Sequence, residues 1–222
     1  MKITKLMLKD KGACAKGYGD FCKRYPESEY PDGVEYQALL NDCANEERDD
    51  YASWLLRAFG GTKDTVVFDE EVKSEKSLYF AGSVVFKKDV STNKRIKAGC
   101  GIKAGRDIEA GWDIEAGWGI EAGWGIEAGC GIEAGLGIEA GLGIKAGEDI
   151  EAGCGIEAGL GIEAGWGIEA GWGIETGRSF GIYAGLRTAI DNNEYRTVSA
   201  KYKPENLMCG IFKPIEIKED VK

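Results

Sequence analysis

The sequence predicts a mainly β fold: a β-solenoid (β-helix) of six-residue strands, with a small N-terminal helical unit and a C-terminal β cap. The first observation is an internal repeat, because GIEAGW with small variations fills the middle of the chain. The second is a spacing, because an apolar residue occupies every sixth position from Val66 to Ile174. The third is composition, because glycine supplies 34 of the 222 residues, about twice its ordinary share.

Three segments are expected along the chain: a helical unit over residues 1–61, the solenoid over 62–178 and the capping strands over 179–222. Three stretches of the first segment place apolar residues at three- and four-residue spacing, which is typical of amphipathic helices: GACAKGYGDFCKRY, GVEYQALLNDCANEE and DDYASWLLRAFGG. Three short helices bury too little apolar surface to fold independently, so we expect them to pack onto the solenoid. The two apolar stripes are Tyr36, Leu39, Leu40 and Cys43, and Tyr51, Trp54, Leu55 and Phe59.

A six-residue period favours a solenoid over a helix. In an Ile-Glu-Ala strand, isoleucine and alanine point to one face and glutamate to the other. Glycine then permits a bend, since it reaches backbone angles closed to other residues. A helix with about 3.6 residues per turn would carry isoleucine around all its sides, and its glycines would destabilise it. Each hexad is therefore expected to form one strand and one corner, with either two or three strands per coil.

The register changes near the C-terminus. Ile182 to Gly185 repeats the motif two residues out of step, and Phe180 fills the old register. Apolar and polar residues then alternate from Tyr195 to Tyr202, and a further candidate strand runs from Asn206 to Ile217. We expect these segments to pair with the last coil and to cover its open end, which would otherwise be a template for aggregation.

The negative charge of the chain is concentrated in the repeat. The whole chain has a net charge of −10, and residues 96–178 alone hold 5 basic and 15 acidic side chains. This distribution argues against direct binding to nucleic acid or to a membrane surface, and it favours a basic protein partner, cations or a solubilising role.

The residue that follows each repeat isoleucine forms a column on the predicted outer face. With three strands per coil the column supplies one carboxylate per ~1.6 Å of axis, and with two strands one per ~2.4 Å, against one charge per ~1.7 Å in duplex DNA. The column is therefore interpreted either as a solubilising face or as a mimic of nucleic acid. Its candidate partner-binding members are Glu109, Glu115, Glu121, Glu127, Glu133, Glu139, Glu151, Glu157, Glu163 and Glu169, while Lys97, Lys103 and Lys145 interrupt it.

The residue two positions before each isoleucine forms a second column. Arginine, lysine and glutamate share this column, and a deep core does not accept unpaired charges, so we place it at exposed or partly exposed corners. The resulting aromatic ridges are expected to be covered by the helical unit or by a second copy of the chain, or else to form a partner surface. Their tryptophans are Trp112, Trp118, Trp124, Trp166 and Trp172.

The sequence indicates no enzyme chemistry. The chain has no histidine, so it lacks Ser-His and Cys-His arrangements. Repeated carboxylates share one environment, whereas an acid–base pair needs two. The seven cysteines show no zinc spacing, and we expect no catalytic, cofactor or metal site. Without a signal peptide or an apolar run long enough to span a membrane, the bacterial host cytoplasm is the predicted location.

The stretches IEAGWDIEAGW and KAGEDIEAG resemble the Ile-x-Ala-Gly-x-Asp-Ile repeats of bactofilin-like, polymer-forming β-helix proteins, and also those of phage and prophage proteins. The N-terminal GAC…F…YPDG…DYASWLLRAFG resembles a short helical module at the start of other prophage-type proteins. These resemblances imply a β-helix architecture. Pentapeptide-repeat proteins, some of which mimic DNA and act on topoisomerase, are similar only in shape and charge.

These observations favour a non-enzymatic interaction protein. The leading hypothesis is an acidic solenoid that occupies the basic nucleic-acid-binding surface of a host protein. It would then act as a phage-type inhibitor, either of a defence nuclease or, as an anti-CRISPR protein, of a CRISPR component. The alternative is a structural scaffold that self-associates, for example as a homodimer, through its tryptophan ridges. An enzyme that binds a small molecule or cation is the third hypothesis.

Overall fold

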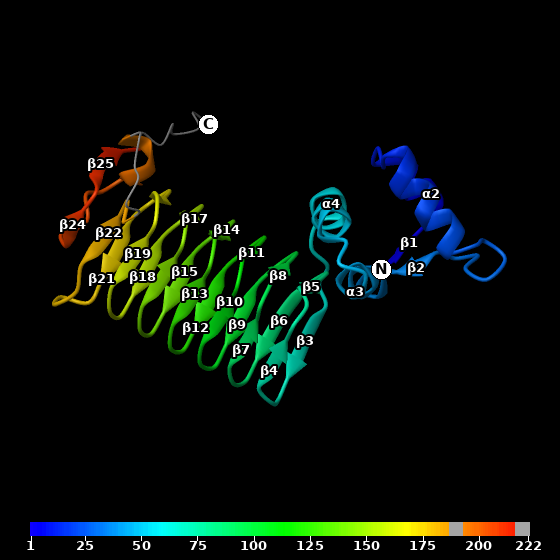
Figure 1. The fold of residues 1–222 in the computed structure, drawn as a ribbon, viewed down its shortest axis with the longest axis horizontal. Helices are drawn as coiled ribbons and strands as arrows, with labels where there is room; N and C mark the ends of the chain where they lie inside the picture. Colours follow the sequence, from blue (N-terminus) through cyan, green and yellow to red (C-terminus); the bar gives the residue numbers. More distant parts are fainter. Residues whose placement is uncertain (187–192, 216–222) are drawn as a thin grey trace, which may run out of the picture.

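The computed structural model describes residues 1–186 and 193–215, which form a parallel β-solenoid with a helical unit at its N-terminal end (Figure 1). The solenoid has three sheets, each made of every third strand along the chain up to β23, after which β24 and β25 extend two of them. Sheet 1 contains β3 (Thr65–Phe68), β6 (Ser83–Phe86), β9 (Ile102–Ala104), β12 (Ile120–Ala122), β15 (Ile138–Ala140), β18 (Ile156–Ala158) and β21 (Ile174–Thr176).

The other two sheets form the remaining two sides of the solenoid. Sheet 2 contains β4 (Val72–Ser74), β7 (Val90–Thr92), β10 (Ile108–Ala110), β13 (Ile126–Ala128), β16 (Ile144–Ala146), β19 (Ile162–Ala164), β22 (Ile182–Ala184) and β24 (Leu207–Cys209). Sheet 3 contains β5 (Leu78–Phe80), β8 (Ile96–Ala98), β11 (Ile114–Ala116), β14 (Ile132–Ala134), β17 (Ile150–Ala152), β20 (Ile168–Ala170), β23 (Thr197–Ala200) and β25 (Ile211–Pro214).

The strand register decides how many strands make one coil. Ile120 pairs with Ile102 on one side and with Ile138 on the other, so neighbouring coils are three hexads apart. Each isoleucine is buried in the interior with the alanine two residues later, and the intervening side chain points outward. The predicted β-solenoid is confirmed, and of the two coil geometries left open by the sequence the structure has three strands per coil.

The first coils lack the Ala-Gly signature but follow the predicted register. Phe68, Phe80 and Phe86 fill their interior, where the rings of Phe68 and Phe86 stack with centroids 5.2 Å apart. These larger side chains replace the small alanines of later coils. The apolar anchors from Val66 onward therefore belong to the solenoid.

The repeat glycines serve a purpose other than the one predicted. Among the described residues, the glycines with positive φ angles are Gly12, Gly33, Gly60, Gly185 and Gly210, and none of these lies in the GIEAGW hexads. The glycine after each alanine instead lies against the previous coil: a Cβ atom on Gly117 would be 2.3 Å from the carbonyl oxygen of Gly99. The prediction that glycine supplies unusual backbone angles is wrong here, because the close approach of coils excludes a side chain.

The aspartates of the repeat tie neighbouring coils together. The Oδ1 atoms of Asp107, Asp113 and Asp149 accept hydrogen bonds from the backbone N–H groups one coil later, at 2.7, 3.2 and 2.8 Å. Their donors are Gly125, Gly131 and Gly167. Part of the negative charge therefore has a structural function.

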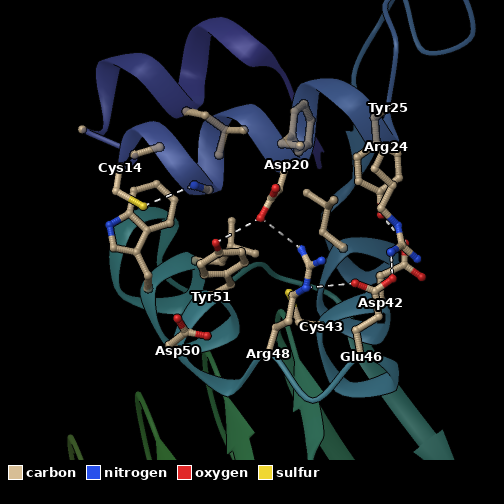
Figure 2. A pocket seen from close by; sticks show the side chains of 18 residues that line it. Cys14, Asp20, Arg24, Tyr25, Asp42, Cys43, Glu46, Arg48, Asp50 and Tyr51 are labelled. Atoms are coloured by element: carbon tan, nitrogen blue, oxygen red, sulfur yellow. Dashed lines mark hydrogen bonds and ion pairs between the residues drawn. The ribbon is translucent and has the colours of Figure 1, made fainter.

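The helical unit has four helices, one more than the three predicted, arranged as two hairpins joined by a short antiparallel ribbon. The hairpins are α1 (Lys5–Asp10) with α2 (Ala15–Arg24), and α3 (Tyr36–Asn45) with α4 (Asp49–Phe59); the ribbon pairs β1 (Lys2–Ile3) with β2 (Val34–Glu35). The hairpins face each other in Figure 2. The predicted stripe on α3 is fully buried, whereas on α4 Leu55 is buried and its stripe partners are half-buried.

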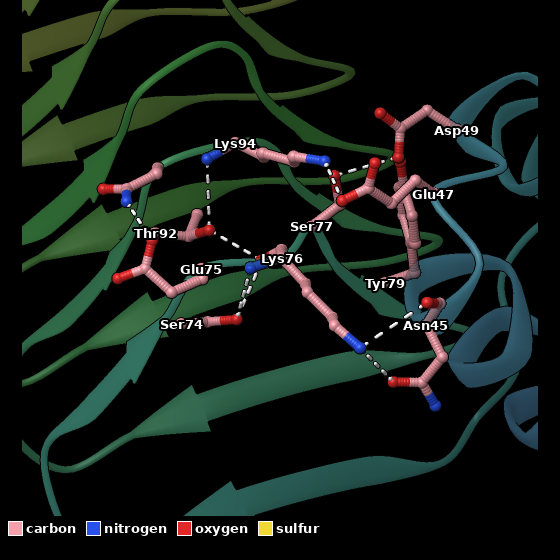
Figure 3. Close-up of polar contacts among 11 residues, drawn as sticks. Asn45, Glu47, Asp49, Ser74, Glu75, Lys76, Ser77, Tyr79, Thr92 and Lys94 are labelled. Atoms are coloured by element: carbon pink, nitrogen blue, oxygen red, sulfur yellow. Dashed lines mark hydrogen bonds and ion pairs between the residues drawn. The ribbon is translucent and has the colours of Figure 1, made fainter.

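The helical unit packs onto the first coil, as predicted. Tyr79 and Ala81 belong to its apolar core, and the Gln37 amide donates to the Tyr79 carbonyl (2.7 Å) and accepts from the Ala81 N–H (2.9 Å). Figure 3 shows polar contacts around this joint, where Ser77 donates to Asp49 (2.9 Å) and the Lys94 Nζ lies 2.9 Å from the Glu47 carboxylate.

The C-terminal strands extend the sheets in parallel. β22 pairs with β19 after the predicted two-residue slip, and β23 pairs with β20 and β25. β24 pairs with β22. The predicted pairing with the last coil is confirmed for these strands; Ile217, the end of the last candidate strand, lies outside the described residues.

Candidate interaction surfaces

The outward glutamates form one column on each sheet. On sheet 3, Glu115, Glu133, Glu151 and Glu169 follow one another without interruption, which defines the sheet 3 column. On sheet 1, Glu121, Glu139, Glu157 and Glu175 do the same and define the sheet 1 column. On sheet 2, Lys145 separates Glu127 from Glu163, and Glu109 precedes Glu127. The structure thus distributes the predicted residues over three faces, two of them continuously acidic.

Lysines neutralise one end of each continuous column. The Lys97 Nζ lies 2.6 Å from the Glu115 carboxylate, and Lys103 pairs with Glu121. On sheet 2, Lys145 lies 3.4 Å from Glu127. Within residues 1–186 and 193–215, Glu133, Glu139 and Glu157 form no ion pair. The middle of each continuous column is therefore uncompensated.

The pKa of Glu151 indicates that stacking carboxylates on sheet 3 costs electrostatic free energy. Its side chain is exposed, yet partial desolvation raises the pKa of its carboxyl, and the nearby carboxylates of Glu133, Asp149 and Glu169 raise it further. Like charges placed directly opposite each other on paired strands are destabilising. The sheet 3 column is thus a place where the fold tolerates repulsion.

The tryptophan column winds onto three separate corners. The corner before sheet 1 carries Trp118 and Trp172, separated by Leu136 and Cys154. The corner before sheet 2 carries Trp124, and the corner before sheet 3 carries Trp112 and Trp166. On no corner do two of these tryptophans occupy adjacent coils, so the ridges predicted from the sequence are divided into short patches.

These corner side chains lie at the surface, as predicted. On the corner before sheet 1, Trp118 is 56% exposed, Leu136 51% and Trp172 57%, against 46% for Trp124 on the corner before sheet 2. A cation lies over a ring on each corner: Arg95 is 5.0 Å from the Trp112 ring centroid, Arg106 is 5.1 Å from that of Trp124, and Lys201 is 5.1 Å from that of Trp172. Cys100, at the start of the corner before sheet 1, donates from its thiol to the Thr62 carbonyl (3.3 Å), and the helical unit does not cover the exposed side chains of Trp112, Trp118, Trp124 and Trp172.

A cavity of about 320 Å³ lies between α2 and the α3–α4 hairpin (Figure 2). Ion pairs cross its mouth: Arg48 lies 3.7 Å from the Asp20 carboxylate and 2.9 Å from that of Glu46. Arg24 pairs with Asp42 at 3.4 Å and also with Glu46. Sequence reasoning missed this cavity, because its residues come from two hairpins whose packing no local pattern predicts.

Two groups of the cavity have pKa values shifted by burial. Burial raises the pKa of the Cys43 thiol to about 11, so this thiol stays protonated and is a poor nucleophile. Burial, followed by the hydrogen bond to Asp42, raises the pKa of the Tyr25 hydroxyl. Both groups therefore stay neutral in the wall of the cavity, where the Tyr25 hydroxyl donates a hydrogen bond and the Cys43 side chain contributes apolar surface.

The described residues contain neither a metal-binding cluster nor a helix that could span a membrane. Residues 1–186 and 193–215 contain no group of three or more Cys, Asp or Glu side chains arranged to hold a metal ion. Over the same ranges, no helix has the length and apolar character needed to cross a bilayer.

Comparison with known proteins gives one match. Residues 1–59, which form the helical unit, match the family model described as the YdhT N-terminal domain. The match ends before β3 and so does not extend to the solenoid. No curated protein and no solved structure matches the chain.

Proposed function

We propose that this protein is a non-enzymatic acidic solenoid that binds the basic, nucleic-acid-binding surface of another protein. The observation that carries the proposal is the pair of continuous carboxylate columns on sheets 1 and 3. In coils of ~4.8 Å, these two columns supply about one carboxylate per 2.4 Å, and coils that also carry glutamate on sheet 2 supply about one per 1.6 Å, close to the ~1.7 Å of duplex DNA.

The cost of the columns supports a role beyond solubility. A solubilising surface works best with both charge signs interspersed, as sheet 2 has around Lys145. On sheet 3, Glu151 instead lies between Glu133 and Glu169; partial desolvation raises the pKa of its carboxyl, and these neighbouring carboxylates raise it further. A basic partner would relieve this repulsion, and the long-range field of the columns would steer the encounter.

The proposal also includes the cellular location of the protein and the class of its partner. The repeat resembles those of phage and prophage proteins, which favours a bacterial host cytoplasm and a host defence protein, such as a nuclease or a CRISPR component, as partner. The resemblance to bactofilin-like repeats supports the second candidate below. The helical unit serves as a cap for the first coil in either case.

The first experiment compares the faces. The protein is used to capture partners from a bacterial lysate at low and high salt, with duplex DNA as competitor. We expect capture to weaken as salt rises, DNA to compete, and Glu133→Lys with Glu151→Lys and Glu169→Lys to abolish capture. The matched control reverses Glu109, Glu127 and Glu163 on the interrupted face. Capture that survives the sheet 3 reversal and the equivalent sheet 1 reversal contradicts the proposal.

A self-associating scaffold is the second candidate, and the exposed corner before sheet 1 favours it. Trp118 and Leu136 lie on adjacent coils there and form a continuous apolar patch. If this patch joins two chains, light scattering should give a dimer or larger species, and Trp118→Ser should return it to a monomer. Trp124→Ser, on a different corner, is the control. A wild-type chain that stays monomeric at high concentration excludes this candidate.

A further inference from the structure

The two helical hairpins share one apolar core, which includes Leu8 and Leu39, but beside it they are bridged by long side chains over a cavity. α2 contributes no fully buried side chain, and Phe21 on its inner face is only half-buried. Arg48, Arg24 and Tyr51 reach across to the opposite hairpin, where Tyr51 donates to Asp20 at 3.2 Å. The space beneath these bridges is the cavity of about 320 Å³ in Figure 2.

We propose that this cavity binds a small organic cation, namely one aromatic ring or short branched alkyl group that carries an amine. The site is separate from the acidic columns and does not depend on the function proposed for them. Its volume falls within the range of small-ligand pockets, roughly 300–1,000 Å³. Apolar and aromatic side chains form its walls: Leu8, Phe21, Leu39, Tyr51, Trp54 and Leu55.

The charges at the mouth select a cation over an anion. Four carboxylates line the cavity, against two guanidinium groups, and both guanidinium groups are already paired with Asp20, Asp42 and Glu46. An anion would have to displace these carboxylates. The lining therefore keeps an excess of two negative charges, and in the described part of the chain no cation pairs with Asp50; Figure 2 shows Asp50 at the edge of the cavity, below Tyr51.

Geometry and chemistry together define how such a ligand would lie. The ring would occupy the space between Phe21 and Trp54, where it removes apolar surface from water. The ammonium group would remain near the mouth, where it donates to the Asp50 carboxylate and faces the Tyr51 ring. A neutral group at the same place would leave Asp50 without its counter-ion.

Three ligands with the same ring test the charge preference in the full-length wild-type protein. Phenethylamine, 2-phenylethanol and 3-phenylpropionate are titrated by calorimetry at physiological salt, which screens binding to the exposed acidic columns. We expect phenethylamine to bind about tenfold more tightly than either analogue. Equal affinity for all three compounds, or no binding of phenethylamine, overturns the proposal.

Variants locate the site. Asp50→Asn should weaken phenethylamine binding about five- to tenfold, whereas Asp10→Asn, an exposed carboxylate outside the cavity, should leave it unchanged. Ala13→Phe should fill the cavity and abolish binding, with circular dichroism as the check on folding. Because Asp50→Asn changes only a surface group, the test stands even if Ala13→Phe fails to fold. Loss of binding in Trp118→Ser but not in Asp50→Asn would assign the amine to the solenoid corner and overturn the proposal.

Discussion

The two glycines of each hexad differ in what surrounds their α-carbons. A Cβ atom on Gly135 would be 2.2 Å from the carbonyl oxygen of Gly117, a distance that real side chains do not reach. A Cβ atom on Gly137 would be 3.5 Å from the oxygen of Gly155, which is ordinary contact. The second position also accepts aspartate at Asp107, Asp113 and Asp149. One glycine is therefore a requirement of coil stacking and the other is a tolerant surface position.

This difference predicts unequal effects of the same substitution. Gly135→Ala should destabilise the protein by about 2–4 kcal/mol, because the coils must move apart or distort. Gly137→Ala should change stability by less than about 1 kcal/mol, since the methyl group meets no close neighbour and alanine restricts the unfolded chain. Urea denaturation of the two variants measures both values. Similar losses in the two proteins would contradict this account of the glycines.

At the scale of the strand column, sheets 2 and 3 present opposite electrostatics on the same backbone. Lys145 lies between two glutamates on sheet 2, whereas Glu151 on sheet 3 lies between Glu133 and Glu169. A carboxyl whose pKa is raised in the folded state binds more protons there than in the unfolded chain. Its contribution to stability therefore falls as pH rises from the unfolded pKa of about 4.5 through the raised folded value.

We accordingly expect mild acid to reduce the repulsion between carboxylates on sheet 3. Because Glu151 becomes protonated, thermal unfolding near pH 5 should occur at a higher temperature than at pH 7. Glu151→Gln should remove part of this difference and stabilise the protein at pH 7 by on the order of 0.5 kcal/mol. Glu127→Gln, which removes the partner of Lys145 on sheet 2, is the matched control and should bring no gain. A stability profile for Glu151→Gln that parallels the wild type would refute the repulsion argument.

At the scale of the whole molecule, the solenoid was predictable because each hexad repeats the same physical choice, with isoleucine inward and glutamate outward. The number of strands per coil was not, because two- and three-sided coils share one period, and only the pairing of Ile120 with Ile138 distinguishes them. The acidic residues were identified from spacing, but their division among faces follows from that same pairing. The cavity depends on how β1–β2 brings Asp20 opposite Arg48, a contact without sequence periodicity.

Gln37 joins the helical unit to the first coil of the solenoid. The Gln37 side chain satisfies two backbone groups at the edge of the first coil, the Tyr79 carbonyl and the Ala81 N–H. Gln37→Leu would leave both groups without partners in a partly buried place, at a cost of about 1–3 kcal/mol. We expect hydrogen exchange to accelerate at Ala81 and along β5, with the distant coils unaffected. Ala38→Leu, at an exposed position of α3, should leave exchange at Ala81 unchanged. If Gln37→Leu exchanges like the wild type, packing of Tyr79 and Ala81 alone holds the unit in place.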